Sequence, residues 1–83
     1  MSLDQRVKEV VAECLGINWR TIENETRLAE ELGADSLDLA DLAFRIMKEF
    51  EHQKKLDITK ADEDAFHTIQ DILNYLQKEG IEQ

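Results

Sequence analysis

The chain has 83 residues, contains no proline and few aromatic residues, and carries a formal net charge of −9 at pH 7. This length fits one domain with a modest core, and the composition favours helices. The negative charge argues against nucleic acid and anionic membranes as partners, because both bind clusters of Lys and Arg. It favours a basic protein partner, although simple solvation also accounts for an acidic surface. We expect no signal peptide and no membrane span, and the single cysteine, Cys14, fits the reducing cytoplasm.

The first predicted helix begins at Ser2 or Asp4, either of which is a suitable N-cap, and runs to about Leu15. Its apolar residues recur at helical spacing and form one stripe: Leu3, Val7, Val10, Val11, Cys14 and Leu15. Gly16 follows this stripe and is predicted to end the helix. Because Cys14 belongs to the stripe, we interpret it as a small core residue rather than a redox or nucleophilic group.

Residues 18–34 lack strong periodicity and predict a long connection, with one short helical turn within residues 26–32. Four apolar side chains are expected to anchor this connection: Trp19, Ile22, Leu28 and Leu32. Trp19 is predicted to cover the core as a half-buried lid, and the alternative role is an anchor for a partner. Gly33 supplies the backbone freedom for the turn that ends the connection.

A second helix is predicted from Ser36 to Phe50 or Glu51, and its start carries the strongest signal in the chain. Asp35 and Asp38 have the spacing of a capping box. Ser36 then falls at the first helical position, where its hydroxyl has no capping role and projects into solvent. The helix dipole and free N–H groups would stabilise a phosphate ester at that position. The inward face is expected to hold Leu39, Leu42, Ala43, Ile46, Met47 and Phe50.

Four charged residues of this helix are spaced by three or four positions and are predicted to share one exposed stripe: Asp38, Asp41, Arg45 and Lys48. Acidic residues come early and basic residues late, which suits the helix dipole and accounts for the pattern in structural terms. A functional interpretation adds Leu37 and Phe44, because apolar residues beside ordered charges are typical of a docking patch. Phe44 is equally compatible with the core.

A polar link over residues 51–55 leads to a short third helix or turn within residues 56–66, capped by Thr59 or Asp57. Its acidic cluster lacks the spacing of a calcium-binding loop, so we interpret it as a solvated turn: Asp62, Glu63 and Asp64.

Thr68 and Asp71 form a second predicted capping box, which opens the last helix. The buried stripe of this helix is expected to hold Ile69, Ile72, Leu73 and Leu76. Gly80 is predicted to end it, and residues 81–83 are expected to fray.

No catalytic or metal-binding set is predicted. His52 lies in the polar link and His67 precedes a helix cap, and neither has a sequence neighbour that would complete a triad or a metal site. Ser36 lacks the Gly-x-Ser-x-Gly setting of a nucleophile, so its expected role is to accept a modification. We therefore expect a protein that is not an enzyme.

Residues 32–38, Leu-Gly-Ala-Asp-Ser-Leu-Asp, resemble the signature of acyl carrier proteins. The similarity extends over most of the chain and includes Leu3, Leu15, Gly16, Leu28, Phe50, Thr68, Ile69 and Tyr75. It implies an all-α fold, a small four-helix bundle with three long helices and one short helix. It also implies a freestanding carrier domain over residues 1–83 that acts as a monomer.

The resemblance implies that Ser36 carries phosphopantetheine, which a phosphopantetheinyl transferase attaches from coenzyme A with the help of a divalent metal. The thiol of this arm would hold acyl groups as thioesters. Acyl-transfer and condensing enzymes of fatty-acid synthesis, or of related lipid and polyketide pathways, would then be the partners. An aminoacyl, peptidyl or other specialised cargo is the alternative. A helical interaction module that never carries an arm is a further one.

In that family, partner enzymes recognise the helix that follows the modified serine. The docking residues implied by position, with Asp35 beside the serine, are Asp35, Leu37, Asp38, Asp41 and Phe44. Arg45 and Lys48 join this surface but depart from the acidic pattern of the family, which predicts a changed set of partners. The link over residues 51–57 is also longer than the usual connection. A long acyl chain is expected to shelter between helices, where Ala40 and Ala43 would leave room.

Overall fold

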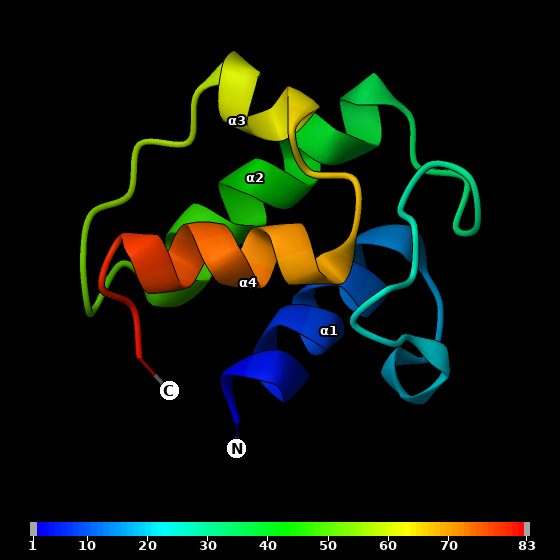
Figure 1. Ribbon diagram of the computed structural model, residues 1–83, viewed down its shortest axis with the longest axis horizontal. Coiled ribbons are helices and arrows are strands. Elements are labelled where there is room, and N and C mark those ends of the chain that lie inside the picture. Colours follow the sequence, from blue (N-terminus) through cyan, green and yellow to red (C-terminus); the bar gives the residue numbers. More distant parts are fainter. Residues whose placement is uncertain (1, 83) are drawn as a thin grey trace.

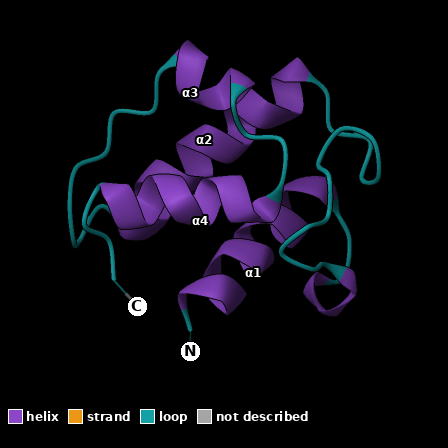
Figure 2. Cartoon of the chain, viewed as in Figure 1, coloured by secondary structure: helices purple, strands orange, loops and turns teal. Residues whose placement is uncertain are grey.

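The computed structural model describes residues 2–82, which form four α-helices and one short 3-10 turn (Figure 1). The elements are α1 (Leu3–Leu15), η1 (Trp19–Thr21), α2 (Ser36–Phe50), α3 (Lys60–Asp64) and α4 (Ile69–Lys78). Helix α1 packs against α2 and α4, while the short α3 packs against α2. Figure 2 shows loops between all of these helices and no strand within the described range. The predicted all-α fold with three long helices and one short helix is confirmed.

The long helices begin and end at the residues that the sequence indicates. Helix α1 starts after Ser2, the first of its two predicted caps, whose hydroxyl oxygen accepts a hydrogen bond from the N–H of Gln5 at 3.2 Å. It ends at Gly16, whose φ of +72° favours a residue without a Cβ atom. Thr68 and Asp71 form the predicted capping box at the start of α4.

One apolar core joins the helices and the loops. The side chains that α2 buries in it are Leu42, Ala43, Ile46 and Phe50. Phe50 is completely buried, and the guanidinium of Arg6 lies 4.6 Å from the centre of its ring. The same guanidinium pairs with Glu49 at 3.0 Å. Arg6 therefore links α1 to the end of α2 and covers the buried ring of Phe50. Among residues 2–82, no helix has the length and apolar character that crossing a membrane requires.

Ala40 does not face the interior, which corrects the prediction that it would help to make room for an acyl chain. Ala43 is buried, as predicted, but Ala40 is exposed. The physical reason is helical periodicity: Ala40 lies three residues after Leu37 and four before Phe44, and both of these are exposed. The three residues therefore form one apolar strip on the outer surface of α2.

The long connection between α1 and α2 is tied to the start of α4. The N–H of Leu28 donates to the carbonyl of His67 at 2.9 Å, and the N–H of Gln70 donates to the carbonyl of Asn24 at 2.8 Å. Leu28 is buried and lies within the predicted helical turn, in which the N–H of Glu31 bonds to the carbonyl of Arg27 at 3.0 Å. The sequence did not predict η1.

Trp19 is half-buried and packs against the edge of the core, as the lid interpretation predicts. The guanidinium of Arg20 lies 4.8 Å from the centre of its ring.

Helix α3 is capped by Thr59, one of its two predicted caps.

The segment between α2 and α4 contacts the C-terminal end of the described chain. The side chain of Gln53 donates to the carbonyl of Glu82 at 2.6 Å and accepts from its N–H at 2.9 Å. Ile81 is buried against the core. The prediction that this end would fray is therefore wrong for Ile81 and Glu82, and its last residue, Gln83, lies outside the described residues.

Candidate functional site

Ser36 is the first residue of α2, and the capping box predicted around it is present. The N–H of Asp38 donates to the carboxylate of Asp35 at 2.9 Å, and the N–H of Asp35 donates to the carboxylate of Asp38 at 3.0 Å. Two carboxylates thus perform the capping, and Ser36 is left exposed. Within residues 2–82, no hydrogen bond occupies its hydroxyl. The site therefore presents a free alcohol to solvent.

The backbone around Ser36 suits a phosphodiester. Within the described chain, the N–H groups of Ser36 and Leu37 make no backbone hydrogen bond, since the first residues of a helix have no intrahelical acceptor. These two donors and the positive end of the helix dipole favour negative charge at this point. The residues present thus fit the phosphopantetheine group that the resemblance implies.

The loop before Ser36 has a fixed shape. Gly33 adopts a φ of +72°, as a glycine turn predicts. The N–H of Ala34 donates to the carbonyl of Leu28 at 2.9 Å, and both side chains are buried. Leu28 is in turn bonded to the loop that precedes α4. The alcohol is therefore held at a defined place above the core.

Two large apolar side chains lie on the surface of α2 beside this site. Leu37 is 79% exposed and Phe44 is 58% exposed, which assigns Phe44 to the surface rather than to the core. They lie seven residues apart, or about two turns, and therefore share one face of the helix. Asp35 is exposed and Asp38 is half-buried at the upper end of the same helix.

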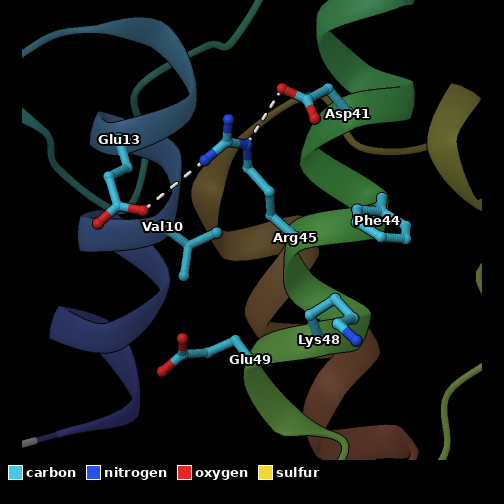
Figure 3. Close-up of a pocket in the computed structure, with 7 residues that line it drawn as sticks. All are labelled: Val10, Glu13, Asp41, Phe44, Arg45, Lys48 and Glu49. Carbon is cyan, nitrogen blue, oxygen red and sulfur yellow. Dashed lines mark hydrogen bonds and ion pairs between the residues drawn. The ribbon is translucent and has the colours of Figure 1, made fainter.

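Arg45 leaves the predicted stripe and turns toward α1. Its Nε lies 3.1 Å from the carboxylate of Asp41, and its Nη1 lies 3.7 Å from the carboxylate of Glu13 on α1. Figure 3 shows the guanidinium between these two carboxylates. Lys48 stays exposed on α2, and its Nζ lies 3.8 Å from Glu51. Sequence reasoning missed Glu13, because the contact depends on how two helices pack.

Cys14 contacts the same group of charges. Its Sγ lies 3.5 Å from the carboxylate of Asp41 and 3.7 Å from the carbonyl of Asp38. Burial, and next the hydrogen bond to Asp41, raises the pKa of the Cys14 thiol to about 11. Cys14 is half-buried rather than fully inside, although it does pack against the core as predicted. Its thiol is protonated and weakly nucleophilic at neutral pH.

The titratable side chains do not gather into a reactive centre in the part of the chain described here. His52 and His67 are both exposed, and they lie in separate loops. Within residues 2–82, no group of three His, Cys, Asp or Glu side chains is placed to hold a metal ion.

Known proteins resemble the chain over nearly its whole length. A family model described as "Phosphopantetheine attachment site" matches residues 5–76. An acyl carrier protein of Bdellovibrio bacteriovorus is 34% identical over 80 residues, which cover 96% of this chain and 97% of the relative. The chain therefore belongs to the acyl carrier protein family, whose members hold acyl groups as thioesters on a covalent phosphopantetheine arm.

Proposed function

We propose that Ser36 is the residue to which the phosphopantetheine arm is attached. The single observation that carries this proposal is the exposed Ser36 hydroxyl at the first position of α2, beside two backbone N–H groups without acceptors. Ser36 Oγ would form the new bond to phosphorus while the pyrophosphate bond of coenzyme A breaks and adenosine 3′,5′-bisphosphate leaves. The serine proton would pass to a base on the transferase. When bound, the arm supplies the thiol that forms the thioester.

We propose that acyl-handling enzymes dock on the surface of α2 and perform the chemistry, while this chain does none. A phosphopantetheinyl transferase and the acyl-transfer and condensing enzymes of fatty-acid-type synthesis are the expected partners. The exposure of Leu37 and Phe44 supports this docking role, because large exposed apolar side chains are typical interface anchors. The complete proposed docking set is Asp35, Leu37, Asp38, Asp41, Phe44, Arg45 and Lys48.

We further propose that residues 1–83 form one carrier domain that acts as a monomer in the cytoplasm. A single core cluster that includes residues from every long helix supports the first point. The unpaired cysteine supports the third, because disulfides are rare in a reducing compartment.

The attachment proposal is tested by the mass of the intact protein. The chain is incubated with coenzyme A, magnesium and a broad-specificity phosphopantetheinyl transferase. Ser36→Ala is the test variant, and Ser2→Ala, which alters the other serine of the chain, is its matched control. The mass of the wild type and of Ser2→Ala should rise by one phosphopantetheinyl group, and that of Ser36→Ala should not. Modification of folded Ser36→Ala would refute the assignment.

A further inference from the structure

Arg45 and Lys48 are the two basic residues in the C-terminal half of α2, here called its lower half, and each forms a long ion pair with a glutamate. Glu13 lies 3.7 Å from Arg45 and its side chain is 81% exposed, while Glu51 lies 3.8 Å from Lys48. Both separations exceed the usual range for a charge-assisted hydrogen bond, and exposed ion pairs of this kind stabilise little. By contrast, Arg45 Nε donates to Asp41 at 3.1 Å. The guanidinium is therefore held in position on one edge and loosely paired on the other.

Arg45 and Lys48 line a groove of about 400 Å³ between α1 and α2. Its lining consists of Val10, Glu13, Asp41, Phe44, Arg45, Lys48 and Glu49. Figure 3 shows Arg45 reaching across the groove toward α1, with Phe44 on the side of α2 away from α1. Glu49 is already paired with Arg6 at 3.0 Å. On a chain of net charge −9, this groove is a place where acidic and basic groups nearly balance.

We propose that this lower half of α2 receives an acidic segment of a partner protein, and that a carboxylate of this segment replaces Glu13 on Arg45. The proposal rests on the docking role proposed above and gives it a partner chemistry. A guanidinium has five N–H donors in a planar fork, so the edge that Glu13 holds only loosely can donate to both oxygens of an incoming carboxylate. Lys48, one turn later, offers a second cation. An apolar side chain of the same segment would contact Phe44, which is exposed.

A basic segment fits this place poorly. It would have to displace Arg45 from Asp41, which also accepts the hydrogen bond of the Cys14 thiol. It would also meet the positive charges of Arg45 and Lys48 at close range, and like charges at an interface oppose association. The start of α2 carries only carboxylates, at Asp35 and Asp38, whereas the groove adds the cations of Arg45 and Lys48. The two ends of α2 therefore favour a partner whose charge changes along its length. Glu13 competes with the incoming carboxylate for Arg45.

The test uses matched synthetic helical peptides that share a leucine stripe and differ only in flanking residues, which are Glu, Gln or Lys. Each is titrated into the isotope-labelled unmodified chain at physiological ionic strength, where the Debye length is about 8 Å. Backbone shifts and the Arg45 Nε–H signal are followed by NMR. The Glu peptide should bind more tightly than the Gln peptide and shift the signals of residues 44–48. Arg45→Gln should weaken binding of the Glu peptide by about threefold to fivefold, the range expected for loss of one exposed ion pair.

The informative variant is Glu13→Gln, which removes the competing carboxylate. It should strengthen binding of the Glu peptide by about threefold and leave the Gln peptide unchanged. Glu25→Gln, a matched change at an exposed glutamate, should leave the affinity for both peptides unchanged. Equal binding of the Glu and Gln peptides to the wild type, or equal effects of Glu13→Gln and Glu25→Gln, would overturn the proposal. Since the titration needs no arm, its failure is distinct from failure of the Ser36 mass assay.

Discussion

The thiol of Cys14 donates a hydrogen bond to the carboxylate of Asp41, 3.5 Å away, and this bond joins α1 to the docking helix α2. The same carboxylate accepts from Arg45 Nε at 3.1 Å. The hydrogen bond from Arg45 to Asp41 is the main cause of the raised pKa of Arg45. The separate hydrogen bond from Cys14 to Asp41 contributes, after burial, to the raised pKa of Cys14. Asp41 is therefore a shared acceptor, and its charge is partly neutralised within the chain itself.

Alkylation of Cys14 should require unusually high pH. Its pKa is raised from 9.0 to about 11, so at pH 9 the thiolate fraction should be about one hundredth instead of one half. Reaction with iodoacetamide, followed by mass, should reach half of its limiting rate near pH 11. Asp41→Asn should lower this midpoint only in part, because burial is the larger cause. A midpoint near 9 in the folded wild type would contradict the described environment.

The same shift has a consequence for folding. Because the pKa is higher in the folded chain than in the unfolded one, the neutral thiol stabilises the fold fully below pH 9, and this contribution is lost as the pH rises through 11.

Removal of the cap before Ser36 should destabilise the chain. Asp35→Ala deletes the acceptor for the N–H of Asp38 and should cost about 1 kcal/mol of unfolding free energy. Asp35→Asn keeps an acceptor at the same position and should cost less. Urea unfolding measures both, and Asp57→Ala, at an exposed loop position, serves as the control. Equal stability of the Asn and Ala variants would mean that the cap contributes little.

Two phenylalanines of α2 should respond in opposite ways to truncation. Phe50 is fully buried, so Phe50→Ala should cost about 3–5 kcal/mol, a large part of the stability of a small domain. Phe44 is 58% exposed, so Phe44→Ala should change the unfolding free energy by less than about 0.5 kcal/mol. The Phe44 variant should instead lose rate in acyl transfer by a partner enzyme. Unfolding curves and transfer rates measured on the same samples separate the two roles.

The long loop should be stabilised by Asn24. Its side-chain N–H group donates to Asp4 at 3.1 Å and to Gln70 at 3.3 Å. Asn24→Ala should cost about 1–2 kcal/mol, because it leaves partly buried partners unsatisfied. Hydrogen exchange at the amide of Gln70 should become faster, while Glu25→Ala, at the neighbouring exposed residue, should leave it unchanged. Unaltered exchange in Asn24→Ala would show that backbone contacts alone hold the loop.

The sequence predicted those features of the fold that depend on local chemistry. Ser2, Asp35 and Thr68 cap helices because short polar side chains satisfy the N–H groups that a helix start leaves free. Gly16 ends α1 because glycine, which has no Cβ atom, adopts positive φ without strain. The position of Ser36 at the start of α2 follows from the capping box, so its place in the site was also accessible from the sequence.

Other features depend on tertiary packing and were missed or wrong. The periodic pattern placed Ala43 on the inward face, but the expectation that Ala40 would also leave room for an acyl chain was wrong, because Ala40 shares the exposed face of Leu37 and Phe44. The η1 turn has only three residues, too few for periodicity. The contact of Arg45 with Glu13 joins two helices that are distant in the sequence, and only their packing reveals it. Of the four charges in the predicted stripe, Arg45 consequently pairs with Glu13 on α1, whereas Lys48 stays on the surface of α2.

The tie between Leu28 and His67 has a consequence for kinetics. The segment before Ser36 is held through Ala34, Leu28 and the start of α4, so the alcohol is already in position before any enzyme arrives. An approaching enzyme therefore loses little conformational entropy in ordering this loop, and association is not slowed by a search among loop shapes. The long connection, whose apolar side chains were expected to anchor it, therefore holds the Ser36 oxygen in place through backbone hydrogen bonds to the start of α4.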